Sequence, residues 1–329
     1  MIIKGNPEAI YRVIRETTAH DNNLLNIKWL CEIAGVSRSG YYRWIEAEPV
    51  RAARDARDRQ DFDLILIAYK YRGYAKGARS IHMRLLHLKP PVVMNIKKIR
   101  RLMNKFGLFC PIRQANPYRR MMQAMRTNRV AENLVNREFR AHGARMILLT
   151  DITYIPRGDG KFSYLSTILD AYTRQVLSYV LSNSLEVDFV LETVNKLIKN
   201  HGDTLSVNDK TLVHSDQGCH YTSYAFIEII RNKELRQSMS RKANCWDNAP
   251  QESFYGHMKD EINLTGCLTH GQICDIIDDW MDYYNNERYQ WDLAKLSPNE
   301  FYEYITTGIY PLPIAPPIEG ERGDTHDDE

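Results

Sequence analysis

The sequence has no uninterrupted apolar run approaching about 20 residues, the length that a membrane-spanning helix needs. Its first 16 residues mix charges into an apolar pattern, so they lack the continuous apolar core of a signal peptide. Its six cysteines include no CxxC pair, which favours reduced thiols over a disulfide framework or a zinc knuckle. A G-x-x-x-x-G-K-[ST] phosphate-binding loop is also absent. The missing loop is consistent with chemistry that needs no high-energy cofactor. The lack of a membrane-spanning run and of a signal peptide argues against a membrane protein and predicts a cytoplasmic one.

The charged residues are divided unevenly along the chain. With 329 residues there is room for two or three domains, and 43% hydrophobic with 26% charged residues is an ordinary globular composition. Residues 1–145 contain 29 Lys and Arg against 12 Asp and Glu, whereas the remainder contains 15 against 29. The basic half predicts contact with phosphates, and the acidic half predicts either a solvated surface or carboxylates gathered for a metal.

Residues 27–45, IKWLCEIAGVSRSGYYRWI, have the pattern of a helix, a tight turn and a second helix. Gly35 stands at the turn, and Ser37 is placed to cap the second helix. We predict a helix-turn-helix whose second helix meets DNA near its start; a purely structural helical hairpin is the alternative. The residues near that start are Arg38, Ser39, Tyr41, Tyr42 and Arg43.

A second pair of helices is predicted over residues 77–109, where Pro90 and Pro91 separate them. The later helix is crowded with residues that we assign to DNA binding, namely Lys97, Lys98, Arg100 and Arg101. His82 and His87 are five apart and share no helix face, so they are a poor metal pair. Residues 111–135 are polar and basic with little periodicity, which predicts a linker that orders on DNA.

The acidic half has a different pattern. Residues 145–182 contain successive runs rich in Ile, Leu, Tyr and Thr, broken by the turn RGDGK, and these runs predict strands. A helical period follows over 186–200, then a short strand at 211–214 and a helix over 223–235. Strands first, then helix and strand in alternation, predict a mixed sheet flanked by helices.

Three acids stand at defined places in this pattern. Asp151 lies inside the first strand, and Asp216 lies just past the strand at 211–214. Glu252 falls in the first turn of a helix that Pro250 suits and that Asp247 or Asn248 would cap. Carboxylates are the ligands that Mg²⁺ prefers, and two such ions can activate a nucleophile and stabilise the leaving oxygen of a phosphodiester. On spacing alone, any three of the 41 acids would be weak evidence.

A family resemblance rests on these same residues. LTDITYI, HSDQGCHYTS and QSMSRKANCWDNAPQESFYGHMKDE resemble the D, D, E signature of the retroviral-integrase-like catalytic core in bacterial insertion-sequence transposases. The 35 residues between Asp216 and Glu252 are the family's usual interval. The motif YYNNERYQWDLAKLSPNEFY resembles the family's tail motif, and the tandem helix-turn-helix region resembles its N-terminal portion. The resemblance therefore covers nearly the whole chain. One departure is Ala243, where relatives often carry Gly.

The resemblance implies a multidomain chain, with all-α helix-turn-helix units before an α/β ribonuclease-H-like core that has a mixed five-stranded sheet. It implies that Asp151, Asp216 and Glu252 are the metal-binding catalytic acids. The implied activity is that of an OrfB-type DDE transposase, which uses two Mg²⁺ or Mn²⁺ ions to cut insertion-sequence ends and join the exposed 3′-hydroxyl to target DNA. A non-catalytic DNA-binding regulator and a structure-selective nuclease are the alternatives.

The implied partners are double-stranded DNA, both terminal inverted repeats and target, and further copies of the chain in a homo-oligomer on DNA. The implied location is the bacterial cytoplasm, at the nucleoid, with no membrane partner. Family products often include an upstream, frameshift-fused segment with a helix-turn-helix and a coiled coil. Residues 1–26 hold no heptad run, so such a segment is implied as a possible partner and is not recognised within this sequence.

Residues around the three acids gain expected roles. Lys259 lies seven residues after Glu252, on the same helix face, and in integrase relatives a lysine at this spacing contacts the DNA end; a plain surface lysine is the alternative. We expect Arg241 and Lys242 to meet DNA. The residues expected to orient metal ligands or waters are His214, Ser215 and Gln217.

Other residues of the acidic half are expected to be structural. Arg288 is either a structural ion pair or a functional residue, and Trp246, Trp280 and Trp291 are expected to pack. The predicted domains are a helix-turn-helix domain at 1–60, a second DNA-binding helix-turn-helix domain at 61–125, a basic linker at 126–144, the catalytic core at 145–305 and an acidic, disordered tail at 306–329.

Overall fold

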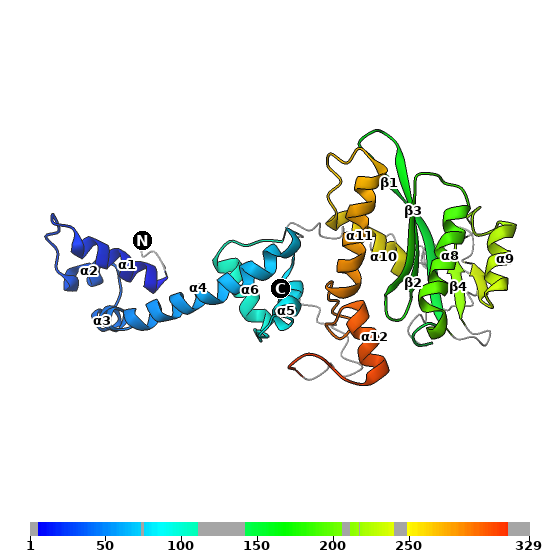
Figure 1. Ribbon diagram of the computed structural model, residues 1–329. Helices are drawn as coiled ribbons and strands as arrows, with labels where there is room; N and C mark the ends of the chain where they lie inside the picture. The colour runs from blue at the N-terminus through cyan, green and yellow to red at the C-terminus, as the bar shows by residue number, and fades with distance from the viewer. Residues whose placement is uncertain are drawn as a thin grey trace, which may run out of the picture. The chain divides into compact units, whose positions relative to one another are not determined.

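The computed structural model describes residues 6–73, 76–110, 142–205, 211–216, 218–239 and 249–314. The chain forms two compact units, Met1–Ile67 and Ala68–Glu329. The predicted linker lies outside the described residues except for 142–144, and the predicted tail lies outside them from residue 315. Figure 1 labels the helices and strands of both units.

The first unit is helical. Its elements are α1 (Pro7–Ala19), α2 (Ile27–Ile33), α3 (Arg38–Glu46) and most of α4 (Glu48–Lys70). The Ser37 hydroxyl accepts a hydrogen bond from the Gly40 N–H at 3.1 Å and so caps α3. Gly35 turns the chain with a φ of 68°, in the left-handed region that favours glycine. The helix-turn-helix predicted over residues 27–45 is therefore confirmed.

One expectation about α3 is wrong. Tyr41, which we expected near DNA, is 4% exposed and packs with Ile14 and Cys31 in the core of the first unit. The tertiary packing of α1 against α3 covers this side chain, whereas Arg38 and Arg43 remain exposed. The surface available to a nucleic acid on α3 is thus basic and lacks Tyr41.

The second unit begins with η1 (Tyr71–Gly73), α5 (Ala78–Leu86) and α6 (Ile96–Lys105), and the helix pair predicted around Pro90 and Pro91 is confirmed. One face of α6 is buried through Ile99, Leu102 and Met103. The four basic residues assigned to DNA lie outside this buried face. Lys97, Arg100 and Arg101 are exposed, and Lys98 is half-buried. This helix therefore presents a basic face.

A five-stranded mixed sheet forms the centre of the second unit. Its strands are β1 (Ile147–Pro156), β2 (Phe162–Asp170), β3 (Val176–Ser182), β4 (Leu212–Ser215) and β5 (Arg236–Met239), in the order β3-β2-β1-β4-β5. Short turns join β1, β2 and β3 into an antiparallel meander, whereas helical crossovers bring β4 and β5 parallel to β1. The sheet expected for a ribonuclease-H-like integrase core is confirmed.

Helices cover both faces of this sheet (Figure 1). They are α8 (Asp188–His201), α9 (Tyr224–Asn232), α10 (Ala249–Glu261) and α11 (His270–Asn286). The short helix η2 (Gly202–Thr204) follows α8, and α12 (Pro298–Thr307) packs against α11. Leu149 packs in one core cluster with Phe254 and Trp280 of α10 and α11. Leu148 packs in the other, with residues of α8 and α9. Because strand side chains alternate between faces, Asp151 lies on the α10 face with Leu149.

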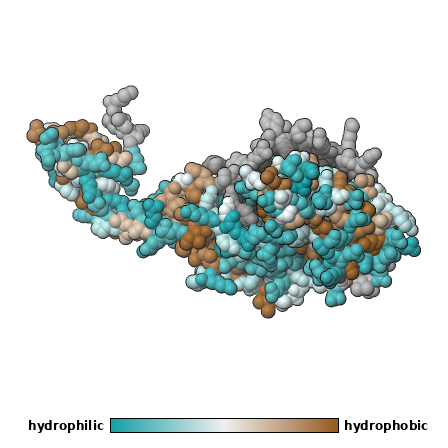
Figure 2. Space-filling model, turned by 45° about the horizontal axis from the view of Figure 1, so that its top comes forward, coloured by the Kyte–Doolittle hydropathy of each residue, from teal (hydrophilic) through white to brown (hydrophobic). Residues whose placement is uncertain are grey.

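The packed region extends past residue 305. Leu312 is buried with Leu86, Ala294 and Leu296, and the Tyr310 hydroxyl donates a hydrogen bond to the Ala294 carbonyl at 2.8 Å. None of the helices in the described residues is long and apolar enough to span a bilayer. The face drawn in Figure 2 is mostly hydrophilic, with separate hydrophobic patches.

Candidate active site

The two aspartates come from adjacent parallel strands. Asp151 lies within β1, and Asp216 directly follows β4, which pairs with β1. One oxygen of each carboxylate is held by a nearby backbone N–H: Asp151 Oδ1 accepts from Ile152 at 2.8 Å, and Asp216 Oδ1 accepts from Gly218 at 2.9 Å. A Cβ at Gly218 would lie 2.9 Å from Asp216 Oδ1, so a larger residue there would displace this carboxylate oxygen.

Helix α10 is fastened to β1 at the position of Asp151. The Tyr255 hydroxyl donates a hydrogen bond to the Asp151 carbonyl at 2.7 Å and lies 2.8 Å from Thr167 Oγ1 on β2. The Gln251 amide donates to the same Thr167 hydroxyl. All three side chains are buried. Since Glu252 directly follows Gln251, this neutral network sets where Glu252 stands relative to Asp151.

The electrostatic environment of Asp151 reflects its neighbours. Burial, together with the negative charges of Asp216 and Glu252, raises the pKa of Asp151 to about 7. The Ile152 N–H and the positive charge of Lys259 act in the opposite direction. Asp216, Glu252 and Lys259 are therefore close enough to Asp151 to alter its ionisation. Like charges gathered at one half-buried position are what a bound cation would offset.

The grouping of the three acids and the chemistry of their ligand atoms bear differently on metal binding. Within the ranges that the structure describes, no three His, Cys, Asp or Glu side chains are grouped so that they hold an ion. The chemistry of Asp151, Asp216 and Glu252 nevertheless fits a hard divalent cation, because all their ligand atoms are carboxylate oxygens. The burial that disfavours a charged Asp151 would be compensated by such an ion.

The residues expected to orient ligands beside Asp216 differ in what they contact. His214 is fully buried, and its Nδ1 lies 3.0 Å from Ser238 Oγ on β5. The Ser215 hydroxyl donates to the Asp216 carbonyl at 3.0 Å, so it contacts the backbone of the acid. Gln217 lies outside the described residues, as do Arg241, Lys242, Ala243, Trp246 and both proposed caps of α10, Asp247 and Asn248.

Arg288 and Trp280 are structural in this fold. The Arg288 guanidinium forms an ion pair with Glu261 at the end of α10, at 2.8 Å. Trp280 is fully buried, and its indole N–H donates to Glu261 at 3.0 Å. The Trp291 ring lies 5.4 Å from the Arg79 guanidinium and 5.3 Å from the Lys295 ammonium.

Sequence reasoning missed the network under the acids. Gln251 and Tyr255 are four residues apart, which places them on one face of α10, and this spacing was a usable signal. Their partner Thr167 is 84 residues from Gln251, so no local pattern could have identified it. The network shows that α10 is positioned by polar contacts as well as by its apolar core residues.

Comparison with known proteins gives matches along most of the chain. A family model described as an integrase core domain matches residues 141–245, and a second model of the same description matches 233–298. An HTH-like domain model matches residues 56–116. Among solved structures, the catalytic core domain of HTLV-2 integrase in complex with magnesium is 15% identical with a TM-score of 0.36, covering 47% of this chain and 94% of that one.

Curated relatives are closer in sequence. The insertion element IS600 uncharacterized 31 kDa protein of Shigella sonnei is 28% identical, covering 83% of this chain and 97% of the relative. The transposase for insertion sequence element IS904 of Lactococcus lactis subsp. lactis is 30% identical, covering 65% and 82%. An uncharacterized transposase-like protein of Haemophilus influenzae is 33% identical, covering 64% and 94%. The chain therefore belongs to the family of insertion-sequence transposases that carry an integrase core domain.

Proposed function

We propose that this chain is a DDE transposase that cleaves DNA at the ends of an insertion sequence and joins the exposed 3′-hydroxyl to target DNA. Family membership indicates DNA transposition broadly, and the polynucleotidyl transferase class follows from it. The observation that carries the finer proposal is geometric: Asp151 on β1 and Asp216 just past β4 come from adjacent parallel strands, and Tyr255 bonds α10, which bears Glu252 and Lys259, to the Asp151 carbonyl. A buried carboxylate among like charges is a typical preparation for metal-assisted chemistry.

In this proposal Asp151, Asp216 and Glu252 hold two Mg²⁺ or Mn²⁺ ions. When bound, such ions supply activation of the attacking oxygen and stabilisation of the leaving oxygen. The backbone N–H groups of Ile152 and Gly218 orient the two aspartates. Lys259, on the same helix as Glu252, supplies positive charge for the phosphate next to the cut bond.

The proposed partners are the terminal inverted repeats and the target DNA, bound by more than one copy of this chain in the bacterial cytoplasm. The exposed residues Arg38 and Arg43 on α3 and the basic face of α6 would contact the duplex. Their phosphate contacts should make binding fall steeply with added salt. Full-length protein titrated onto element ends between 50 and about 200 mM salt tests this, and affinity indifferent to salt would refute a phosphate-dominated interface.

The decisive experiment combines substitution with product analysis. Asp151→Asn, Asp216→Asn and Glu252→Gln should each abolish cleavage and joining of element ends in Mg²⁺ or Mn²⁺ while DNA binding remains. Glu228→Gln, at an exposed acid on α9, is the matched control and should leave both reactions intact. Near-normal joining by any of the three variants would remove that residue from the site.

The products distinguish this proposal from its alternatives. Joined molecules beside cleaved ones support a transposase. Cleavage without joining would indicate a structure-selective nuclease. Tight binding without either reaction, in both metals, would indicate a DNA-binding regulator that keeps the integrase fold.

A further inference from the structure

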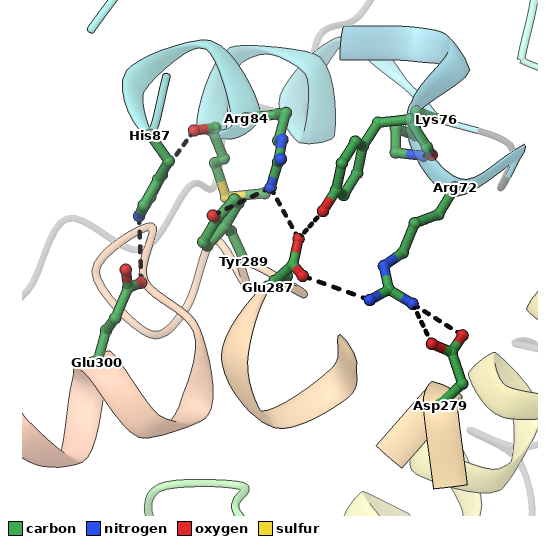
Figure 3. A network of polar contacts seen from close by, with 10 residues as sticks. Arg72, Lys76, Arg84, His87, Asp279, Glu287, Tyr289 and Glu300 are labelled. Atoms are coloured by element: carbon green, nitrogen blue, oxygen red, sulfur yellow. Dashed lines mark hydrogen bonds and ion pairs between the residues drawn. The ribbon is translucent and has the colours of Figure 1, made fainter. Parts of the chain in front are cut away.

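A charged docking surface joins the HTH-like helices to the far end of the catalytic core. On one side are Arg72, Arg84 and His87, and on the other are Asp279, Glu287, Tyr289 and Glu300 (Figure 3). Tyr71 belongs to the first side, because its hydroxyl donates to Glu287. About 200 residues separate the partners in sequence. The segment from the basic half supplies the cations, and the acidic half supplies the carboxylates. The uneven charge of the two halves therefore produces ion pairs between them here.

Glu287 is the centre of this docking surface. Its carboxylate accepts hydrogen bonds from the Tyr71 hydroxyl, from Arg84 at 3.1 Å and from Arg72 at 3.4 Å. The Arg84 guanidinium also lies 3.5 Å from the centre of the Tyr71 ring. The side chains of Glu287 and Arg84 are 26% and 18% exposed, so solvent screens this pair less than a surface pair.

Contacts on either side of Glu287 extend the surface. Arg72 binds both carboxylate oxygens of Asp279 at 2.8 Å. The His87 ring stacks on Tyr289 with centroids 3.5 Å apart, and its Nε2 lies 3.1 Å from Glu300 Oε2. Leu86 packs in an apolar cluster with the residues that precede α12. Helix α5 is thus held by ionic, stacking and apolar contacts together.

Glu287 contacts α5, and the residue after it contacts α10. Arg288 is paired with Glu261, the last residue of α10, and α10 also carries Glu252 and Lys259. On the other side, α5 packs against α6, whose opposite face is basic. Two consecutive residues, Glu287 and Arg288, therefore connect the HTH-like helices to the helix that bears a catalytic acid.

We propose that Glu287 is a positioning residue, through which the docked HTH-like helices present a bound DNA end to the acids at one defined place. This inference rests on the proposed function. Glu287 touches neither DNA nor metal in this proposal; it acts by holding α5, and α5 holds α6. Its loss should leave end binding intact and impair the chemical steps, because small displacements of a reacting group lower rates strongly.

The test uses full-length Glu287→Arg, which sets a cation against Arg72 and Arg84. Joining at saturating DNA should fall by about 100-fold, while the Kd for the element end stays near that of the wild type. Backbone amides of α5, residues 78–86, should exchange hydrogen faster, whereas those of β1 keep their protection. Glu303→Arg, at an exposed acid on α12 outside the docking surface, is the matched control and should behave as wild type.

Charge exchange separates positioning from simple loss of structure. Adding Arg84→Glu to Glu287→Arg restores an opposite-charge pair and should partly restore both joining and the protection of α5. Unchanged α5 protection in Glu287→Arg, or normal joining despite lost protection, would overturn the inference. If the wild type binds ends and joins none, the proposed function fails instead, and the exchange measurements still decide whether Glu287 holds α5.

Discussion

The two ends of α10 are held by different chemistry. In its first two turns, the uncharged side chains of Gln251 and Tyr255 bond to Thr167 and to the Asp151 carbonyl. At its last residue, Glu261 receives the Arg288 guanidinium at 2.8 Å and the Trp280 indole at 3.0 Å. One helix therefore has a neutral anchor beside the proposed catalytic acids and an ionic anchor away from them.

The difference shows where charge is useful. A cationic anchor beside Asp151 would lower the pKa of that carboxyl and compete with a bound metal ion. Hydroxyl and amide groups fix the backbone there without contributing a net charge. At the far end, an ion pair with good geometry holds α10 to the segment that follows α11 without acting on the acids. Each of the following changes tests one side of this comparison.

The largest effect is expected at the ionic anchor. Glu261→Gln leaves the Arg288 guanidinium, whose side chain is 16% exposed, without its counter-charge. Removing one partner of a largely buried pair costs about 3–5 kcal/mol, so urea should unfold the variant at a clearly lower concentration. A loss of unfolding free energy below about 1 kcal/mol would mean that the Glu261–Arg288 pair behaves like an exposed ion pair, and the contrast between the two ends of α10 would disappear.

A pH effect is expected at Lys76, which is 6% exposed beside the ionic anchor. Burial lowers the pKa of Lys76 from 10.5 to about 8, with Glu261 raising it and Arg84 lowering it. Between pH 8 and 10.5 the unfolded chain keeps a proton that the native lysine has lost, so the free energy of unfolding rises with pH.

The measurement compares wild type with Lys76→Met across this pH window. Relative to the variant, the wild type should gain about 3 kcal/mol as the pH rises, because the cost of burying the ammonium disappears. Parallel stability curves for the two proteins would mean that the ammonium is not desolvated in the native state.

A smaller effect is expected at the neutral anchor. Tyr255→Phe removes the hydroxyl shared by Thr167 and the Asp151 carbonyl, which should cost about 1–3 kcal/mol of unfolding free energy. Tyr179→Phe is the matched control, because that hydroxyl donates to Asp278 at the surface, and it should cost under about 1 kcal/mol. Equal costs in thermal unfolding would show that burial of the network adds nothing.

The smallest effect is expected at an exposed ion pair. Glu192 and Lys196 lie one turn apart on α8 at 3.3 Å, and both side chains are about half exposed. Glu192→Gln should change the free energy of unfolding by about 0.5 kcal/mol or less, since solvent and salt screen the pair. It serves as the control for Glu261→Gln, and a comparable loss in both would contradict the role assigned to burial.

Much of the local structure was predictable from the sequence. Gly35 and Ser37 marked the turn and the cap of the first helix-turn-helix, and the run rich in Ile, Leu, Tyr and Thr around Asp151 placed it inside a strand. The family resemblance, and not spacing alone, named Asp216 and Glu252 as its proposed companions, and both acids raise the pKa of Asp151. These signals work because capping, turn conformation and strand alternation depend on residues only a few positions apart.

Other features were decided only by the tertiary structure. Tyr41 was expected to face DNA and is buried, because the neighbouring helices of the first unit cover it. Thr167 becomes the partner of Gln251 and Tyr255 only when β2 pairs with β1 beneath α10. Glu287 meets Arg84 across about 200 residues of chain. The periodicity of a helix or strand predicts which face a side chain occupies. The free energy of packing elements that are distant in sequence determines which residues contact that face.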